Sequence, residues 1–514
     1  MFLAFSDSAK FAIIARNITN GLGFGNDFSF WSSTFFNFVK GGIFVDSTTP
    51  PVMPFSIAAF FKIFGVNDFA VIATSFFFFI LTLIFTYLLA KKVFNSKLVG
   101  ALSTLAVGAS YDIIHYATNG ASESPFIFEI VAASYFASIK KKWANVLTLI
   151  LLILMYFTRP MAFIYIAGII LYWLLNNLKT KKAIIIFGII LVVGFFFDRM
   201  VLYPLSGKMF LYSVSMRGAI SATAQATTSV TSEALRGVET ASIGTNNIQI
   251  FKNIFYNLYN FYKLMPQIIS PYLFTLFALG LFIKSKTKEI SSFKISVLFM
   301  FALTLLVVAA SIPFFRYIHP VVPLVYIVAV GTLVTIINSQ FKTSKQLLTI
   351  LISTFLILLF GVGQTLGAFL LDSRFEKNTH NVGKPPIYVE FSKVLKENTI
   401  PDQTIITNLD TWGSWYGERK TIWFPLEPKQ LIDPATGKVP FDAIYLTSYL
   451  MDDQNYYMGE AWRTIFDNPK DTALWICDGC PEIAREFKLG EIYQVKASDN
   501  YERQDGRAIL LIKK

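Results

Sequence analysis

Long apolar runs, separated by short basic or turn-rich loops, constrain the fold of this chain more than any other feature. A helix needs about 20 mostly apolar residues to cross a bilayer. Ten candidate spans fit this pattern: 69–90, 98–116, 122–139, 144–158, 160–176, 183–203, 266–284, 293–312, 317–337 and 346–370. Two of them, 144–158 and 160–176, are short, and "TRP" at 158–160 predicts a tight turn between them. The sequence therefore predicts an α-helical polytopic membrane protein with about ten spans.

The composition supports a membrane protein. Hydrophobic residues make up 54% of the chain and charged residues only 15%, whereas soluble domains carry about 25% charged residues. The net charge is +12. In membrane proteins such an excess usually reflects basic loops on one side of the membrane. Because the basic residues are scattered in short clusters between apolar runs, we expect no nucleic-acid partner.

Lysines follow every second candidate span. They are Lys91, Lys92 and Lys97; Lys140, Lys141 and Lys142; Lys179, Lys181 and Lys182; Lys284, Lys286, Lys288 and Lys294; and Lys342 and Lys345. The positive-inside rule assigns these loops to the cytoplasm. It leaves 1–68, 112–123, 204–265 and 371–514 on the outer side. The prediction is a multi-pass plasma-membrane protein whose N-terminal loop and C-terminal domain are extracytoplasmic, and we expect one more span before Met1.

Three domains follow from this pattern. Residues 1–68 form a first outer loop with amphipathic helices, and 69–370 form the transmembrane domain, including the Ser/Thr/Ala-rich outer loop 204–265. That loop is long enough for a functional lid or a disordered connection. Residues 371–514 form an exported α/β domain. Its expected strands are "TIITNL", "KTIWFP", "FDAIYLTSYL", "ALWICD" and "AILLIKK", after a helix in "PIYVEFSKVLKEN".

Cys477 and Cys480 are the two cysteines of the chain and form a single C-x-x-C pair. Zinc ribbons need two such pairs, so this pair alone does not predict a zinc site. In an exported domain, an oxidising compartment favours a disulfide. No metal site is expected elsewhere.

Ionisable residues near the spans gather on the predicted outer side. They are Asp7, Asp27, Asp46, Asp112, Glu123, Arg159, Arg316, His115 and His319. A charge at membrane depth costs about 2.5–3.5 kcal/mol on insertion scales, so such residues are candidates for function. Arg316 would alternatively snorkel to lipid head groups, although the topology rule disfavours outer arginines. Carboxylates beside two arginines suit the binding of a lipid-linked phosphate and the deprotonation of a hydroxyl.

Several segments, in order along nearly the whole chain, resemble one family. They are "DSAKFAIIARNITNGLGF", "DSTTPPVMPFSIAAFFKIFG", "ATNGASESPFIFEIVAASYFA", "TRPMA", "RYIHPVVPL" and "TNLDTWGSWYGERKTIWFP". Together they resemble the outer loops and exported tail of C-type (GT-C) membrane glycosyltransferases of the protein-mannosyltransferase and aminoarabinose-transferase kind. Members begin with a cytoplasmic N-terminus and a span before the first Asp loop. An acid commonly follows that Asp, and here Ser8 stands in its place.

The resemblance implies a site and a reaction. A sugar would move from polyprenyl phosphate to an acceptor lipid, glycan or protein, with inversion through an oxocarbenium-like state. Asp7 would be the general base and Glu123 a second catalytic acid. Arg316, Arg159 and Lys10 would bind the donor phosphate. Asp46, His319 and Tyr317 would support the site. No cofactor beyond the lipid-linked donor is implied, and a divalent metal is not excluded.

Each residue also has a structural interpretation. Asp7 precedes "SAKFAIIA" and would serve as a helix N-cap. Glu123 would be a first-turn acid favoured by the helix dipole. Asp46 fits a turn, and Asp112 with His115 fits a hydrogen-bonded structural pair.

Two other functions compete with the transferase. A lipid-linked glycan flippase or transporter would want polar residues in the centres of its spans, whereas "FAVIATSFFFFILTLIFTYLLA" carries no charge. A non-catalytic protein that binds envelope glycans would tolerate the loss of Asp7. Loss of activity without loss of folding, on removal of that carboxylate, separates the transferase from both.

Overall fold

A computed structural model describes most of the chain. It covers residues 2–3, 5–30, 44–45, 49–197, 200, 247–310, 314–340, 346–359, 385–449, 458–498 and 503–514. Asp46 and most of the predicted outer loop 204–265 lie outside these residues.

Apolar helices form the larger part of the molecule. They are α3 (Asp68–Phe94), α4 (Lys97–Gly108), α5 (Tyr111–Ala117), α6 (Glu123–Ser138), α7 (Lys142–Tyr156), α8 (Ala162–Asn177), α9 (Thr180–Phe197), α13 (Asn247–Lys263), α14 (Pro271–Phe282), α15 (Lys288–Ala310), α16 (Val322–Gln340) and α17 (Gln346–Ile357). Short 3-10 turns precede α14 and α16: η3 (Met265–Gln267), η4 (Phe315–Tyr317) and η5 (His319–Val321). A helix, or a pair of helices, lies in each of the ten predicted spans.

Within the described residues, four helical segments are long and apolar enough to cross a membrane. They are α3, α9, α15 and the segment Phe315–Ser339, and a fifth joins α4 to α5 across a 69° bend. Helices α7, α8 and α14 are apolar but shorter. Of the α9 side chains, only Ala183 and Phe187 are buried, so this helix presents a large apolar surface, as a lipid-facing helix does. The protein is a multi-pass membrane protein.

The helices of the bundle pack against one another, and polar caps mark where they begin and end. Helix α3 packs against α4 and α6, α14 against α16, and α15 against α8. Asn67 begins α3 by accepting a hydrogen bond from the amide of Ala70. Asn95 ends it in the left-handed conformation (φ 48°), which a short polar side chain tolerates. The next residue, Ser96, then caps α4 through the amide of Val99.

The C-terminal domain contains a six-stranded sheet in the order β2-β5-β4-β6-β8-β7. Its strands are β2 (Phe28–Phe30), β4 (Thr404–Thr407), β5 (Lys420–Trp423), β6 (Ala443–Thr447), β7 (Phe487–Ser498) and β8 (Arg503–Lys513). The first four of these pair in parallel, and β6, β8 and β7 pair antiparallel. Short helices accompany it: α20 (Ile387–Glu397), α21 (Trp412–Trp415), η9 (Pro428–Leu431), α22 (Glu460–Asp467), η10 (Thr472–Leu474) and α23 (Cys480–Glu486). The predicted α/β character is confirmed.

In the tail, one predicted strand is wrong and one strand was not expected. "ALWICD" begins in η10, where the Asp471 carboxylate accepts a hydrogen bond from the amide of Ala473, and it runs into the turn that Cys477 and Cys480 close. Their predicted disulfide is confirmed, with a Cα–Cα distance of 5.1 Å. The unexpected strand is β7, which lies at the sheet edge and whose sequence alternates polar with apolar side chains.

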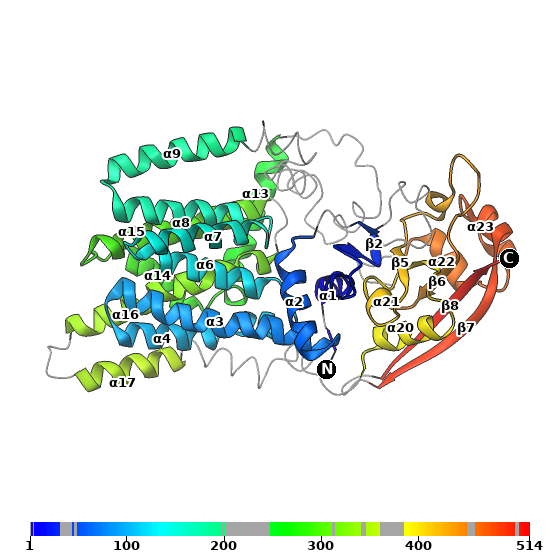
Figure 1. The fold of residues 1–514 in the computed structure, drawn as a ribbon, viewed down its shortest axis with the longest axis horizontal. Coiled ribbons are helices and arrows are strands. Elements are labelled where there is room, and N and C mark those ends of the chain that lie inside the picture. The colour runs from blue at the N-terminus through cyan, green and yellow to red at the C-terminus, as the bar shows by residue number, and fades with distance from the viewer. Residues whose placement is uncertain are drawn as a thin grey trace.

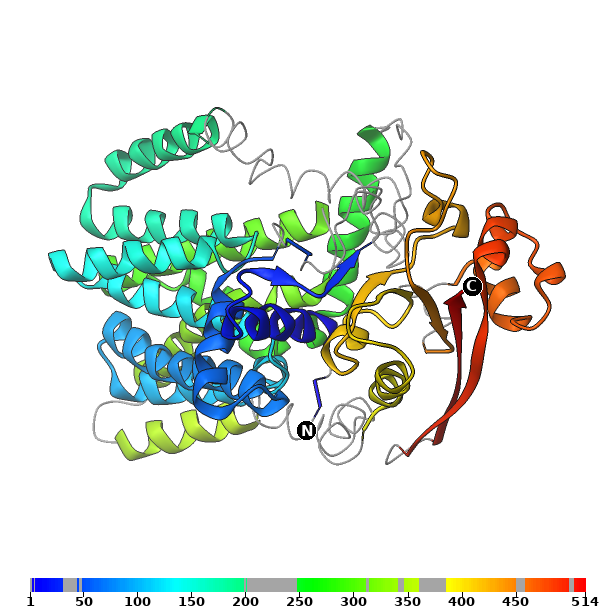
Figure 2. The same ribbon diagram turned by 45° about the vertical axis from the view of Figure 1, so that its right-hand side comes forward.

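The N-terminal segment joins the C-terminal domain through the sheet. It contains α1 (Ser6–Thr19), β1 (Gly25–Asn26), β3 (Phe44–Val45) and α2 (Val52–Phe64). Strand β2 pairs in parallel with β5, with Phe28 opposite Thr421. Buried side chains from residues 3–72 and 387–511 share one hydrophobic core. Figure 1 shows α1 and α2 between the helical bundle and the sheet domain, and the turned view in Figure 2 preserves this order.

Candidate functional site

Asp7 lies in the first turn of α1, at the end of the membrane bundle that faces the sheet domain. The residue that caps this helix is Phe5, and no side chain caps it. The interpretation of Asp7 as the N-cap is therefore wrong. Its carboxylate instead accepts a hydrogen bond and ion pair from Arg316, with Nη1 and Oδ2 3.1 Å apart. Arg316 belongs to the η4 turn, which η5 connects to α16, so the contact joins the amphipathic segment to the bundle.

The Asp7 carboxylate remains accessible although it is paired. Its side chain is 52% exposed, and that of Arg316 is 34% exposed. Partial burial raises the pKa of Asp7, but the positive charges of Arg316, Arg159 and Lys10 outweigh this, and the pKa lies below its usual value. Lys10 is three residues further along α1, so it lies near Asp7 on the same helix face. The carboxylate is thus ionised and can be reached by a molecule from solvent.

Glu123 and Arg159 form a second, more deeply buried ion pair. Nη1 of Arg159 lies 2.6 Å from Oε1 of Glu123, and their side chains are 10% and 4% exposed. The guanidinium also donates to the hydroxyl of Ser122, at 3.1 Å. Glu123 opens α6, as the first-turn interpretation predicted, and Arg159 lies in the turn between α7 and α8. Glu123 therefore holds the Arg159 guanidinium in a fixed orientation.

Tyr317 connects the two arginines. The guanidinium carbon of Arg159 lies 5.6 Å from the centre of the Tyr317 ring, and that of Arg316 lies 5.3 Å from it. Both distances are within the range of cation–π attraction. The Nε of Arg316 is buried and has no hydrogen-bond partner among the described residues. Two cations are thus held around one ring beside an accessible carboxylate.

His319 closes the cluster on its buried side. Its Nδ1 lies 2.5 Å from the hydroxyl of Tyr116, and its Nε2 lies 3.6 Å from a carboxylate oxygen of Asp112. The expected structural pair of Asp112 with His115 is not what forms. The His115 ring instead stacks on Tyr111 and meets the edge of Phe5. The contacts of the buried His319 imidazole therefore fix the position of the segment that carries Arg316 and Tyr317.

The C-terminal domain holds both ends of α1. The Thr411 hydroxyl donates to the carbonyl of Ser6 at 3.0 Å, beside Asp7. At the other end, Arg16 donates to the carbonyl of Ser414 and pairs with Asp27, both at 3.0 Å. The segment "TNLDTWGSWYGERKTIWFP" was part of the family resemblance, but no role was predicted for its residues. Its α21 segment fixes the helix that carries the candidate base.

The same segment is anchored to the first residue of α3. Asp68 accepts hydrogen bonds from the Trp415 indole at 2.7 Å and from the Tyr416 hydroxyl at 2.9 Å. Tyr416 in turn accepts from the amide of Leu3 at 2.8 Å. Sequence reasoning missed Asp68 because it reads as an ordinary first-turn acid. The structure makes it the link between a membrane helix and the sheet domain.

The space around Ser8 explains the missing second acid. Ser8 is fully buried and faces the turn at Gly120, whose φ of +77° favours glycine. A Cβ placed on Gly120 would lie 2.7 Å from Val71 and 3.2 Å from the Cβ of Ser8. A carboxylate at position 8 would be pressed into this contact without a partner.

Glu129 is a buried acid that the sequence reasoning did not select. Its side chain accepts a hydrogen bond from the Thr158 hydroxyl at 2.8 Å, and its other oxygen has no partner among the described residues. Thr158 immediately precedes Arg159. A glutamate within an apolar helix was the available signal.

The structure thus gathers most of the predicted site residues at one end of the bundle. Asp7, Lys10 and Arg316 lie together, Glu123 and Arg159 lie beside them, and Tyr317 and His319 complete the cluster, which we call the Asp7 cluster. Its eighth predicted member, Asp46, lies outside the described residues.

Comparison with known proteins supports one family. Residues 48–198 match the sequence model of the dolichyl-phosphate-mannose-protein mannosyltransferase family. The match confirms the resemblance to membrane glycosyltransferases over a segment that includes Glu123 and Arg159. An uncharacterized protein of Aquifex aeolicus (strain VF5) is 28% identical over 197 residues, which span 36% of this chain and 38% of the relative.

Among solved structures, the chain is similar to ArnT from Cupriavidus metallidurans. The crystal structure of ArnT bound to undecaprenyl phosphate aligns with 99% of this chain and 94% of its own, with 12% identity and a TM-score of 0.47. The apo structure aligns with 98% and 93%, with 12% identity and a TM-score of 0.46.

Proposed function

We propose that this protein is an inverting membrane glycosyltransferase. It moves a sugar from a polyprenyl-phosphate-linked donor to an acceptor hydroxyl or amine on the extracytoplasmic face. The observation that carries the proposal is the accessible Asp7 carboxylate beside Arg316 and Arg159, at the end of a membrane-spanning bundle. The match of residues 48–198 to a family that acts with a lipid-phosphate sugar supports it.

The reaction needs a base for the acceptor and cations for the leaving phosphate. Asp7 takes the proton of the acceptor as the acceptor oxygen or nitrogen bonds to the anomeric carbon. The bond from that carbon to the phosphate oxygen breaks, and its electron pair stays on the phosphate. The donor diester, with one negative charge, becomes a monoester that carries a second one. Positioned proton transfer is worth about 10²–10⁴-fold in rate.

Arg316 has two partners in this scheme, and the exchange between them adjusts the base. In the free enzyme its guanidinium pairs with Asp7 and keeps the pKa of that carboxyl low, which makes a weak base. A donor phosphate that takes hydrogen bonds from Arg316 withdraws part of this interaction. The pKa of Asp7 then rises, so the carboxylate becomes a stronger base when the donor is bound.

Arg159 supplies the second cation, and its neighbours hold it in place. Glu123 and Ser122 fix the guanidinium, and the Tyr317 ring lies near both it and Arg316. Charge-assisted bonds from preorganised arginines stabilise the charge that develops on the leaving phosphate. Glu123 acts in this proposal as a positioning residue, and Lys10 adds positive charge near the phosphate. The reaction uses no cofactor apart from the lipid-linked donor.

The test is a release assay with purified protein. The protein is offered a panel of polyprenyl-phosphate sugars with hydroxyl and amine acceptors, and the free polyprenyl phosphate is measured. Asp7→Asn is compared with Asp402→Asn, which removes an exposed carboxylate of the C-terminal domain. We expect Asp7→Asn to lower release at least 100-fold. The loss of this half-exposed pair should lower its melting temperature by no more than about 2 °C, and it should bind the donor at least as tightly as wild type, because Arg316 no longer pairs with a carboxylate. Asp402→Asn should behave as wild type. A chelator should leave release unchanged.

Other outcomes identify the other functions. Equal release by Asp7→Asn and wild type would move the base elsewhere, and Glu123→Gln would be measured next. Donor binding without release from any donor, in the wild type as well, would favour a flippase or a glycan-binding protein and refute the transferase.

A further inference from the structure

A cavity lies at the other end of the bundle, remote from the Asp7 cluster. Its volume is about 100 Å³, several times the roughly 10–15 Å³ that one water requires. Phe94, the last residue of α3, lines it, whereas the first residue, Asp68, contacts the sheet domain. A helix of 27 residues rises about 40 Å at 1.5 Å per residue. The cavity is therefore about one membrane thickness away from the Asp7 end.

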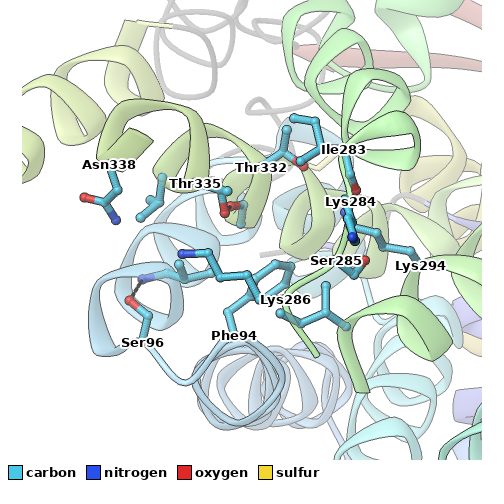
Figure 3. Close-up of a pocket in the computed structure, with 14 residues that line it drawn as sticks. Phe94, Ser96, Ile283, Lys284, Ser285, Lys286, Lys294, Thr332, Thr335 and Asn338 are labelled. Atoms are coloured by element: carbon cyan, nitrogen blue, oxygen red, sulfur yellow. Dashed lines mark hydrogen bonds between the residues drawn. The ribbon is translucent and has the colours of Figure 1, made fainter. Parts of the chain in front are cut away.

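Three lysines line this cavity. Lys284 and Lys286 come from the loop between α14 and α15, and Lys294 comes from the first turns of α15. Figure 3 shows Lys286 extending across the cavity in the direction of Ser96, with Thr332 and Thr335 of α16 behind it. Lys284 and Lys286 are exposed, so their ammonium groups are available to a ligand.

The positive charge of these lysines is not neutralised within the described residues. No carboxylate there pairs with any of the three, and Glu289, the acid closest to them in sequence, pairs with Lys92 at 3.5 Å. Lys294 is 7% exposed and donates to the carbonyls of Gly280 and Ile283, at 2.6 and 3.1 Å. An ammonium has three donors, and neutral carbonyls leave its charge uncompensated. A buried charge of this kind favours an anion beside it.

The backbone around the cavity adds to its preference for an anion. Ser96 and Val99, at the N-terminus of α4, line it, and the positive end of a helix dipole favours a negative charge nearby. Close packing keeps the walls in place. A Cβ on Gly331 would lie 2.2 Å from the Phe94 ring, so only glycine lets α16 approach the end of α3 this closely.

Part of the cavity wall is apolar. Phe94, Val99, Ile283, Ile290 and Val334 line the same cavity as the lysines. A soluble anion gains nothing from these side chains, whereas the glycerol and upper acyl chain of a lipid do. The cavity also lies at the ends of spanning helices, where lipid head groups are found.

We propose that this cavity binds the head group of an anionic phospholipid from the leaflet remote from Asp7, with its phosphate held by Lys284, Lys286 and Lys294. The chemistry recognised is a phosphate diester without a compensating cation, and the bound lipid joins the ends of α3, α4, α14 and α16. This site is independent of the proposed sugar transfer.

The experiment compares lipids on delipidated protein in a neutral detergent. Phosphatidylglycerol, phosphatidylcholine with the same acyl chains, and inorganic phosphate are titrated separately, with binding followed by native mass spectrometry and by the melting temperature. The double variant Lys284→Gln/Lys286→Gln is compared with Lys181→Gln/Lys182→Gln. The control lysines are exposed at the start of α9, close to Leu178, whose carbonyl binds Lys288 at this same end.

We expect phosphatidylglycerol to bind wild type and control equally and to raise both melting temperatures. With roughly fivefold for each lysine that contacts the lipid head group, the cavity variant should bind about 25-fold more weakly while melting as wild type without lipid. Equal binding by the two double variants would overturn the site. Equal binding of phosphatidylcholine and phosphatidylglycerol, or stabilisation by inorganic phosphate alone, would overturn its assignment to an anionic lipid.

Discussion

Arg159→Met provides the sharpest test of how the Asp7 cluster is built. The change keeps an unbranched side chain but removes the cation that faces Glu123. At an N–O distance of 2.6 Å, two unit charges attract by about 6 kcal/mol with an effective dielectric constant of 20. Desolvation of the two ions cancels most of that gain. The variant leaves the Glu123 carboxylate, which is 4% exposed, buried without a cation partner. Breaking such a buried pair costs about 3–5 kcal/mol of folding stability.

The assay is a double-mutant cycle of Arg159→Met, Glu123→Gln and their combination, measured by melting temperature and by polyprenyl-phosphate release. With about 2 °C per kcal/mol for a large domain, Arg159→Met should melt about 6–10 °C below wild type. The double variant should recover most of this loss, because no charge is left unpaired. Its transferase activity should remain low, because the second phosphate-binding cation is still absent.

Two results would refute this reasoning. If Arg159→Met melts as wild type, the pair is not the buried, mutually dependent one that the geometry indicates. If the double variant regains activity together with stability, Arg159 serves only the fold, and the donor phosphate is bound without it.

Three further predictions concern separate parts of the molecule. The pKa of Asp7 is lowered from 3.8 in the folded state, so the stabilising Asp7–Arg316 pair is present above about pH 4 and is lost as the pH falls below it. The acidic limb of the kcat/KM profile reports the free enzyme and should lie below about pH 4, whereas the limb of the kcat profile should lie at a higher pH. Arg316→Gln should move the kcat/KM limb to a higher pH. If the kcat/KM and kcat limbs of the wild type coincide, the proposed exchange of partners is refuted. Asp68→Asn weakens two charge-assisted hydrogen bonds to α21 and should cost about 1.5–3 kcal/mol, with faster amide exchange in residues 411–416; unchanged exchange would show that the link is dispensable. Replacing Cys477 and Cys480 by serine opens a loop of four residues, worth about 2 kcal/mol in the chain-entropy treatment, and should lower the melting temperature without changing release.

The membrane character was predictable because it depends on composition and run length. The apolar segments determine that helices form, and each of the ten predicted spans contains one. The tail was predictable where a strand is central and apolar, as in β4 and β6. It was not predictable at η10, where a local hydrogen bond from Ala473 to Asp471 overrides an apolar run, nor at the edge strand β7.

The candidate site was predictable as a list of residues but not as a set of pairs. The topology rule placed Asp7, Glu123, Arg159 and Arg316 on one side. The topology rule could not predict which acid pairs with which base. The partners are separated by 36 to 309 positions in the sequence, and the distances between their side chains depend on helix packing. Ser8 shows the same limit, since only its contact with the Gly120 turn explains why no acid stands there.

The sequence by itself determined a chain that spans the membrane several times, carries a mixed α/β domain after the spans, and has charged residues near the ends of its helices. These properties follow from local hydrophobicity and charge. Only the tertiary structure decided that β2 of the first loop completes the sheet of the tail and that Thr411 and Arg16 fix the ends of α1. The tertiary structure also left the Asp7 carboxylate accessible and buried that of Glu123. Burial and pairing are properties of distant segments brought together, and no local pattern encodes them.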